Sequence, residues 1–482
     1  MTVHAQPRLQ EVEVQALEPA RLEALIGGER MAHFEQTAEA AQAALAGRIV
    51  WNVNSTAVGG GVAEMLQTLL AYARGAGVDA RWLVIEGARE FFAVTKRIHN
   101  GLYGAPGDGG PLGPAERAIY ERTLRRNAVE LEAVVRPGDI VLLHDPQTAG
   151  LAGAVRAAGA RAVCRCHVGR DEPNEWTDRA WEFLRTDLEE SDAYVFSRAA
   201  FAPSFADAAR THVIPPSIDP FSAKNEAMSA RNVRLALGYV GLLDGDGKPP
   251  IVPFTRRDGS PGRINRHVDV VQSGPAAPPN APLVIQASRW DRMKDMPGVM
   301  HGFAEHVDLS LGAHLVLAGP AVTGVADDPE AVEVYDATVR AWRELPHALR
   351  GRVHLACVPM KDPDEAAAIV NALQRHASVV AQKSLAEGFG LTVVEAMWKS
   401  RPVVASAVGG IADQIVHKEH GLLVDDPGDL AGFGAAVESL LRDRSEAERL
   451  GRNARARAAE QFLGDRHLGQ YARLFDLLEQ LP

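Results

Sequence analysis

Cysteine, aromatic residues and long apolar runs are scarce in this sequence of 482 residues. Three cysteines are too few for a disulfide framework, which favours a reducing compartment. No apolar run approaches the roughly 18 residues that span a bilayer, and residues 1–15 lack the basic patch and apolar stretch of a signal peptide. We therefore expect a cytoplasmic protein with no membrane span.

An excess of positive charge is also missing, because the formal net charge is −11. This argues against nonspecific binding to nucleic acid or to an anionic membrane, although a local basic pocket could still hold phosphates. The fractions of hydrophobic (46%) and charged (23%) residues are ordinary for a globular protein and exclude wholesale disorder. At roughly 100–200 residues per domain, the length suggests two or three domains.

Metal ligands with a recognisable spacing are absent as well. Cys164 and Cys166 fall on one face of an expected strand, and Cys357 is distant in the sequence. A Cys-x-Cys pair with one remote cysteine is a poor zinc pattern. We therefore predict buried structural thiols and no metal site.

Short β-rich runs alternate with helical patterns along almost the whole chain. Many runs are continuously apolar, as in parallel strands that are covered on both faces. Strands are expected at residues 49–53, 82–85, 140–143, 162–166, 194–196 and 212–214, and again at 283–287, 314–317, 353–358, 378–381, 402–405 and 422–424. Two such series predict an α/β fold with two doubly wound, Rossmann-like domains.

Proline and glycine mark the boundaries. Three prolines in residues 215–220 prevent a helix there, and we predict domains at 1–215 and 216–465, followed by a C-terminal helix at 466–482. Residues 241–280 lack periodicity, which indicates an ordered functional loop, an oligomer contact or a loose insertion. Helices are expected at 22–45, 62–74, 115–135, 364–376, 391–399, 429–442, 446–459 and 466–481.

A run of three glycines, Gly59, Gly60 and Gly61, follows the first expected strand and opens a helix. Backbone without Cβ atoms can approach a ligand closely, and free N–H groups at a helix start favour an anion. The spacing matches neither Gly-x-Gly-x-x-Gly nor a P-loop. A tight structural turn is the alternative.

Two basic residues, Arg289 and Lys294, follow the strand expected at 283–287. The carboxyl ends of parallel strands are where doubly wound sheets bind ligands. A guanidinium and an ammonium group there suit a diphosphate leaving group, on which negative charge builds. A solvated charge run is the weaker interpretation.

Two glutamates, Glu387 and Glu395, are separated by a Gly-x-Gly that opens a helix. Carboxylates accept hydrogen bonds from vicinal hydroxyl pairs, so one could hold a hexose and the other a ribose. Glu395 lies in an apolar stretch, which disfavours an ordinary surface position. The N–H groups of the turn between them, at Gly388, Phe389, Gly390 and Leu391, would face phosphate or sugar hydroxyls.

The Glu-x7-Glu pattern, with Arg289 and Lys294 upstream, resembles the retaining nucleotide-sugar glycosyltransferases of the GT-B fold. Further motifs are similar to the trehalose glycosyltransferring synthases. They are Val53-Asn54-Ser55-Thr56, Gly59-Gly60-Gly61-Val62-Ala63-Glu64, His144-Asp145-Pro146-Gln147-Thr148, Arg165-Cys166-His167 and Glu395-Ala396-Met397-Trp398-Lys399. The resemblance runs from residue 49 to the C-terminus.

That resemblance implies an N-terminal acceptor-side domain, a nucleotide-sugar-binding domain, and a last helix that packs back on the N-terminal domain. Glucose would pass from NDP-glucose to free glucose, giving α,α-trehalose with retention. Arg289 and Lys294 would bind the diphosphate, Glu395 the ribose and Glu387 the donor glucose, with Gly60 and Gly61 near the phosphates or the acceptor. His167 would meet the donor sugar near its reacting carbon, and Asp145, Gln147 and Asn54 would bind the acceptor.

No protein nucleophile is evident, so catalysis would rest on positioning and electrostatics. No cofactor is required, although Mg²⁺ could accompany the nucleotide sugar. A homodimer is left open. The alternatives are a trehalose phosphorylase, a transferase with another small acceptor and a non-catalytic nucleotide-sugar-binding protein. The insertion at 241–280 and the run Val168-Gly169-Arg170-Asp171 keep the first two open.

Overall fold

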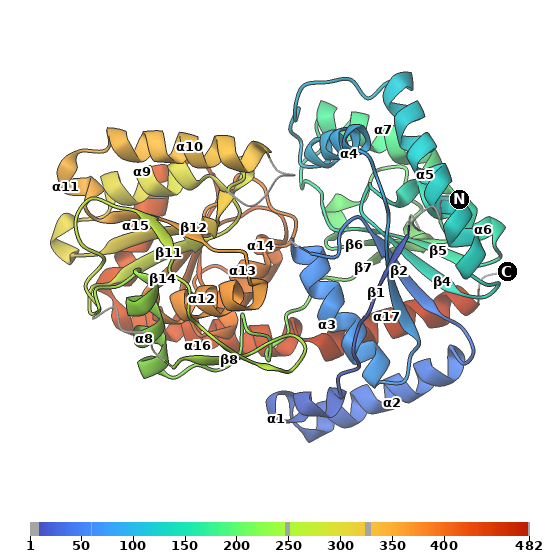
Figure 1. Cartoon of the computed structure of the whole chain (residues 1–482), viewed down its shortest axis with the longest axis horizontal. Helices are drawn as coiled ribbons and strands as arrows, with labels where there is room; N and C mark the ends of the chain where they lie inside the picture. Colours follow the sequence, from blue (N-terminus) through green and yellow to red (C-terminus); the bar gives the residue numbers. More distant parts are fainter. Residues whose placement is uncertain (1–8, 59, 246–250, 323–328, 481–482) are drawn as a thin grey trace, which may run out of the picture. The chain divides into compact units, whose positions relative to one another are not determined.

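The computed structural model describes residues 9–58, 60–245, 251–322 and 329–480. The chain forms two compact units (Figure 1). The first unit comprises Met1–Ser217, Glu387–Phe389 and Phe462–Pro482. The second comprises Ile218–Ala386 and Gly390–Gln461. Each unit is built around its own sheet.

The first unit contains a seven-stranded sheet in the order β1-β3-β2-β4-β5-β6-β7. Only β1 runs antiparallel to its neighbour; the other pairs are parallel. Strands β2 and β4 are buried along their whole length, which explains their mainly apolar sequence. The strands are β1 (Gln10–Val12), β2 (Val50–Asn54), β3 (Ala80–Val84), β4 (Ile140–His144), β5 (Arg161–Cys166), β6 (Ala193–Phe196) and β7 (Thr211–Val213).

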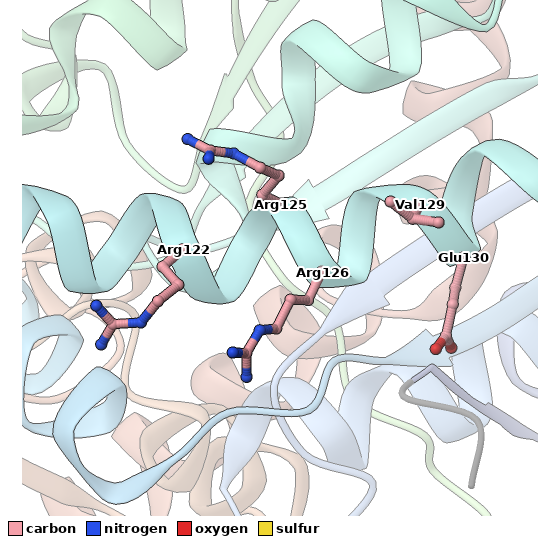
Figure 2. A pocket seen from close by; sticks show the side chains of 5 residues that line it. All are labelled: Arg122, Arg125, Arg126, Val129 and Glu130. Carbon is pink, nitrogen blue, oxygen red and sulfur yellow. The ribbon is translucent and has the colours of Figure 1, made fainter. Parts of the chain in front are cut away.

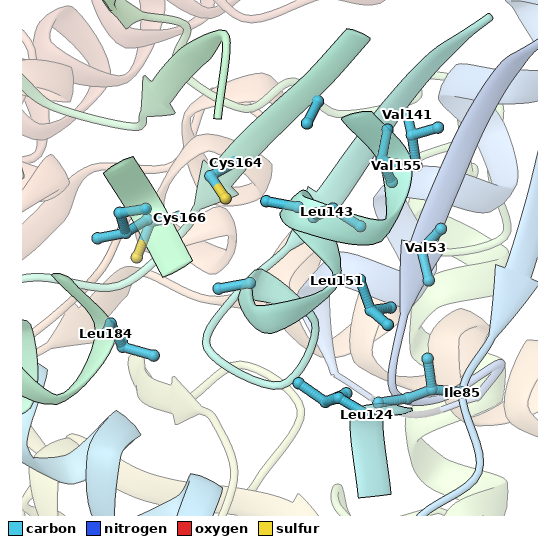
Figure 3. Close-up of a cluster of buried hydrophobic side chains, with 14 of the residues drawn as sticks. Val53, Ile85, Leu124, Val141, Leu143, Leu151, Val155, Cys164, Cys166 and Leu184 are labelled. Carbon is cyan, nitrogen blue, oxygen red and sulfur yellow. The ribbon is translucent and has the colours of Figure 1, made fainter. Parts of the chain in front are cut away.

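Helices cover both faces of this sheet. Figure 3 shows part of the core on one face, where Leu124, Leu151 and Leu184 meet side chains of the strands. A second cluster joins Tyr471, Leu474 and Leu478 of the C-terminal helix to the other face. The helices are α1 (Glu23–Ile26), α2 (Gly28–Ala44), α3 (Gly61–Gly75), α4 (Arg89–Leu102), α5 (Pro114–Val134), α6 (Ala152–Ala157), α7 (Glu175–Glu189) and α17 (Gly464–Glu479).

The second unit contains another seven-stranded sheet, in the order β10-β13-β12-β11-β14-β15-β16. Here β10 is the antiparallel edge strand, and the remaining pairs are parallel. These strands are β10 (Asp269–Val271), β11 (Leu283–Ala287), β12 (His314–Pro320), β13 (Val353–Val358), β14 (Val379–Gln382), β15 (Val403–Ser406) and β16 (Leu422–Val424). A hairpin of β8 (Pro253–Thr255) and β9 (Pro261–Arg263) stands apart.

Most helices of the second unit lie between its strands in the chain. They are α8 (Ala230–Val240), α9 (Met296–His306), α10 (Pro329–Glu344), α11 (His347–Arg350), α12 (Pro363–His376), α13 (Leu391–Trp398), α14 (Gly410–Gln414), α15 (Leu430–Arg442) and α16 (Arg444–Gln461). In each unit the chain first adds strands on one side of an inner strand and then on the other. This reversal lies between β2 and β4 in the first sheet and between β11 and β14 in the second. The carboxyl ends of such strands are the usual ligand sites of doubly wound sheets.

The predicted fold class is confirmed, and each predicted strand has its counterpart. One local prediction needs correction. The single helix expected at 22–45 is broken at Gly27, whose φ of 82° lies outside the helical region. For the insertion at 241–280, where the sequence left ordered and loose alternatives open, the described part is ordered and supplies the β8–β9 hairpin and the edge strand β10. Cys164, Cys166 and Cys357 are buried free thiols, as predicted.

Candidate active site

The turn after β2 carries the glycine run and Asn54. The Asn54 side chain receives a hydrogen bond from Trp82 Nε1 and donates one to the carbonyl of Thr56, both at 2.8 Å. The remaining N–H and lone pair of its amide make no hydrogen bond to a described residue. Gly60 caps helix α3 with a φ of 81°, and both Gly60 and Gly61 are exposed. Gly59 lies outside the described residues.

At the neighbouring strand end, Asp145 and His167 are held together. Asp145 directly follows β4 and has a φ of 64°. Its Oδ1 accepts a hydrogen bond of 2.7 Å from the backbone N–H of His167, which directly follows β5. Burial raises the pKa of Asp145 to about 6. Gln147 lies two residues further along the same turn and is half-buried.

A second histidine, His144, contacts the His167 ring. The two rings stack at a centroid distance of 5.3 Å, and His144 Nδ1 lies 3.0 Å from His167 Nε2. The other nitrogen of His144, Nε2, lies 3.0 Å from Oδ1 of Asn52 on β2. Burial and the charge of Arg165 lower the pKa of His144 to about 3 and that of His167 well below its usual value. Both rings are therefore neutral.

The positive charge that disfavours imidazolium comes from a buried arginine. Arg165 on β5 is fully buried and donates to the backbone carbonyls of Cys166, Val195 and Ile214 and to Ser197 Oγ. These acceptors are neutral, so the guanidinium charge stays available to act on its surroundings. The carboxyl end of β5 is thus a positively charged environment.

The residues Glu387–Phe389 group with the first unit rather than with the flanking chain. A Cβ atom on Gly388 would lie 2.6 Å from the carbonyl oxygen of His167, so a side chain there would displace backbone. The Phe389 ring contacts that of Phe462 at 5.7 Å. Glu387 is buried, with 8% of its surface exposed. The structure therefore brings the loop of Glu387 together with His167.

In the second unit, Arg289 and Lys294 follow β11. The Arg289 side chain is half exposed, and its Nη2 lies 3.2 Å from Asp291 Oδ2. Lys294 ends a short 3-10 helix, Arg292–Lys294, whose position is fixed by a hydrogen bond of 2.7 Å from Gln286 Nε2 to the Lys294 carbonyl. Both residues lie at the strand end where they were predicted.

Helix α13 follows β14, the strand beside β11, and carries Glu395. The helix begins at Leu391 after Gly390, which has a φ of 85°. Glu395 is 3% exposed, and its Oε1 lies 3.6 Å from Lys224 Nζ. Its second oxygen, Oε2, is buried and has no hydrogen-bond partner among the described residues. Buried carboxylate oxygens are rarely left so, and this oxygen can still accept a hydrogen bond.

Sequence reasoning missed a group of buried charges that surround this helix. Lys399 directly follows α13 and donates to Asn225 Oδ1, Gln374 Oε1 and the Glu395 carbonyl. Burial lowers the pKa of Lys399 well below its usual value. Lys383, fully buried after β14, pairs with Asp295. A lysine beside a continuous apolar run was the available signal for Lys383.

A separate hollow lies along helix α5, and Figure 2 shows that its five lining side chains come from that helix. Arg122 and Arg126 project to one side of the helix and Arg125 to the other. Arg122 is paired with Glu90, and Glu130 accepts a hydrogen bond from the backbone of Leu9. The hollow contains no predicted site residue.

Among the described residues, no cluster of three or more histidine, cysteine, aspartate or glutamate side chains could hold a metal ion. No helix among them is long and apolar enough to cross a membrane.

Two family models match the chain. Residues 52–203 match the N-terminal domain of trehalose synthase, and residues 274–457 match glycosyl transferases group 1. A trehalose synthase from Pyrococcus horikoshii is 33% identical over 95% of both chains. The chain belongs to the trehalose synthase family of glycosyltransferases.

More distant relatives share the fold and differ in their reactions. A trehalose phosphorylase from Grifola frondosa is 24% identical over 85% of this chain and 54% of its own length. Among solved structures, a UDP-forming α,α-trehalose-phosphate synthase from Burkholderia vietnamiensis matches with a TM-score of 0.65 and 15% identity, over 90% of this chain and 99% of that one. That likeness identifies the fold as GT-B.

Proposed function

We propose that this glycosyltransferase moves glucose from NDP-glucose to free glucose and forms α,α-trehalose with retention of configuration. Family membership supports a trehalose-related transfer. The UDP-forming synthase of the same fold supports a nucleotide leaving group. Soluble sugars and a nucleotide sugar are then the binding partners.

The observation that carries the donor assignment is the unpartnered Oε2 of Glu395. A ribose hydroxyl can donate to that oxygen, whereas a phosphate, which carries only acceptors when ionised, cannot. The carboxylate therefore favours the sugar part of a nucleotide at this position. Arg289 and Lys294, at the adjoining strand end, supply the positive charge for the diphosphate.

The roles proposed for the other candidate residues rest on their chemistry and on their positions in the fold. Glu387 would hold the donor glucose hydroxyls, aided by backbone from Gly388 to Leu391, while Gly60 and Gly61 approach the phosphates or the acceptor. His167 would bind a sugar hydroxyl near the reacting carbon. Asp145, Gln147 and Asn54 would bind the acceptor.

The reaction needs no covalent intermediate with the protein. The acceptor hydroxyl loses its proton to an oxygen of the departing phosphate, the new C1–O bond forms on the same face, and the NDP leaves. The protein contributes position and electrostatic stabilisation of the leaving group. Mg²⁺ would enter, if at all, with the nucleotide sugar.

A trehalose phosphorylase is the second candidate, favoured by the similarity to the Grifola frondosa protein. Arg289 and Lys294 would serve inorganic phosphate as well as a diphosphate. The buried, unpartnered oxygen of Glu395, which suits a hydroxyl donor rather than an anion, supports the nucleotide-dependent reaction.

Product analysis by NMR separates these reactions. The enzyme is incubated with glucose and ADP-, UDP- or GDP-glucose, and in parallel with trehalose plus NDP or inorganic phosphate. We expect trehalose from at least one NDP-glucose and cleavage of trehalose only with NDP. Cleavage with phosphate would establish the phosphorylase, and donor hydrolysis without trehalose would reject glucose as the acceptor.

A further inference from the structure

A buried chain of side chains connects the middle of strand β2 to His167. It runs from Asn52 Oδ1 to His144 Nε2, and from His144 Nδ1 to His167 Nε2, with both separations at 3.0 Å. Asn52 is 3% exposed, His144 2% and His167 8%. The residues come from β2, β4 and the end of β5, which are adjacent strands of the first sheet.

Asn52, the first residue of this hydrogen-bonded series, determines which nitrogen of each histidine ring carries the proton. The carbonyl oxygen of an asparagine side chain can only accept, so His144 must carry its proton on Nε2. A neutral imidazole has one N–H, and Nδ1 of His144 is then the acceptor. His167 must in turn donate from Nε2, which leaves its own Nδ1 without a proton.

The surroundings keep both rings in this state. Arg165 lies beside the pair, and His467 and the neighbouring ring also oppose a positive charge on His167. Asp145 is the nearby carboxyl group, and it contacts the backbone N–H of His167. Nδ1 of His167 makes no hydrogen bond to any residue that the structure describes.

We propose that Asn52 and His144 are positioning residues, which fix His167 as the Nε2–H tautomer and so make its Nδ1 an obligatory acceptor for a sugar hydroxyl. This inference rests on the proposed function, because it needs a sugar at the end of β5. His167 can then orient a substrate hydroxyl but cannot donate a proton to the leaving group.

The first test reads the tautomers directly. Long-range ¹H–¹⁵N NMR spectra of the full chain with ¹⁵N-labelled histidine distinguish Nδ1–H from Nε2–H rings, and variants H144N and H167N assign the two signals among the 16 histidines. We expect both residues as neutral Nε2–H tautomers from pH 6 to 8. An Nδ1–H tautomer or an imidazolium at His167 would overturn the proposal.

The second test uses the substitution Asn52→Asp to reverse the donor and acceptor roles in the hydrogen bond between His144 and His167. A carboxylate beside His144 favours a second proton on that ring, whose Nδ1–H then donates to His167 and forces the His167 proton onto its own Nδ1. We expect this tautomer change, with a loss of kcat of tenfold or more and an NDP affinity within twofold of the wild type. The tautomer change without a loss of kcat would contradict the positioning role.

A matched control lies in the second sheet, where Gln272 Oε1 contacts His354 Nδ1 and His354 Nε2 contacts His314. Gln272→Glu makes the same change there and should leave kcat within twofold. An equal loss in both variants would mean a general effect of buried charge. The histidine spectra decide the proton positions whether or not transfer is observed, so failure of the proposed function and failure of this inference give different results.

Discussion

The two sheets each contain a stacked pair of histidines, and the pairs are built alike. The rings are 12° from parallel in His144–His167 and 17° in His314–His354, with Nδ1 to Nε2 separations of 3.0 and 2.9 Å. Each pair ends at a side-chain amide oxygen, that of Asn52 or Gln272. Each lies beside a buried arginine that disfavours imidazolium, Arg165 or Arg352.

The two pairs differ in the end of the strands at which they lie. His144 is the last residue of β4 and His167 follows β5, whereas His314 begins β12 and His354 is the second residue of β13. Parallel sheets bind ligands at the carboxyl ends of their strands. On our proposal, the same hydrogen-bonded group would serve a substrate in the first sheet and only the packing of strands in the second. Position in the fold, rather than the residue types, would then decide which pair has a function.

The largest effect is expected at the carboxyl end of the second sheet. Arg289→Ala removes a positive charge from the leaving diphosphate and should lower kcat by about 100-fold, as loss of one charge-stabilising group does elsewhere. Steady-state kinetics with the preferred NDP-glucose measure it. Arg292→Ala is the control. Arg292 lies three residues after Arg289 in the sequence, is exposed, and pairs with Glu333. A similar loss in both variants would count against a specific role for Arg289.

Removing one histidine from each pair tests whether the two pairs differ in function. His144→Ala removes a hydrogen bond from the buried Asn52, and His354→Ala removes one from the half-buried Gln272, so each should lower the free energy of unfolding by about 1–3 kcal/mol. Only His144→Ala should also lower kcat/KM, by about tenfold, an effect typical of a lost positioning contact. Chemical denaturation and kinetics on the same samples test this, and a comparable loss of kcat/KM in His354→Ala would refute the distinction between strand ends.

A smaller effect, on stability and on acceptor binding, is expected when the pH is changed. Burial raises the pKa of Asp145 to about 6, so the folded protein favours its neutral form. The contribution of this group to stability is accordingly present at low pH and is lost as the pH rises from the unfolded pKa through 6. Binding has the opposite sign, because the carboxylate is the stronger acceptor for hydroxyl groups.

The KM for the acceptor should therefore fall several-fold between pH 5 and pH 7. Asp145→Asn keeps an oxygen for the His167 N–H but removes the ionisation, and it should flatten this profile. A profile that is unchanged in the variant would assign the pH dependence to another group.

The strands were predictable because β2, β4, β11 and β13 are buried along their whole length and so are mainly apolar. Strand β10 was not, since its three residues are exposed or half-buried and lie in a segment rich in glycine and proline. It becomes a strand only by pairing with β13.

The places of candidate residues were predictable where they come soon after a strand in the chain, as for Arg289 and Asp145. The histidine chain was not, because Asn52, His144 and His167 are far apart in sequence and meet only when β2, β4 and β5 align. The pairing of Lys383 with Asp295 was missed for the same reason, since these residues follow different strands. The local sequence pattern identifies where strands end, but it does not show which side chains of different strands contact one another.

The central claim is that the unpartnered oxygen of Glu395 accepts a hydrogen bond from the ribose of a nucleotide donor. Calorimetric titration of wild type and Glu395→Ala with the preferred NDP and with its 2′,3′-dideoxy analogue tests this directly. We predict that loss of the ribose hydroxyls weakens binding to the wild type by about tenfold or more, as for a hydrogen bond to a charged group, and to the variant by less than twofold. An equal penalty in both proteins, or undiminished NDP binding by Glu395→Ala, would contradict the account.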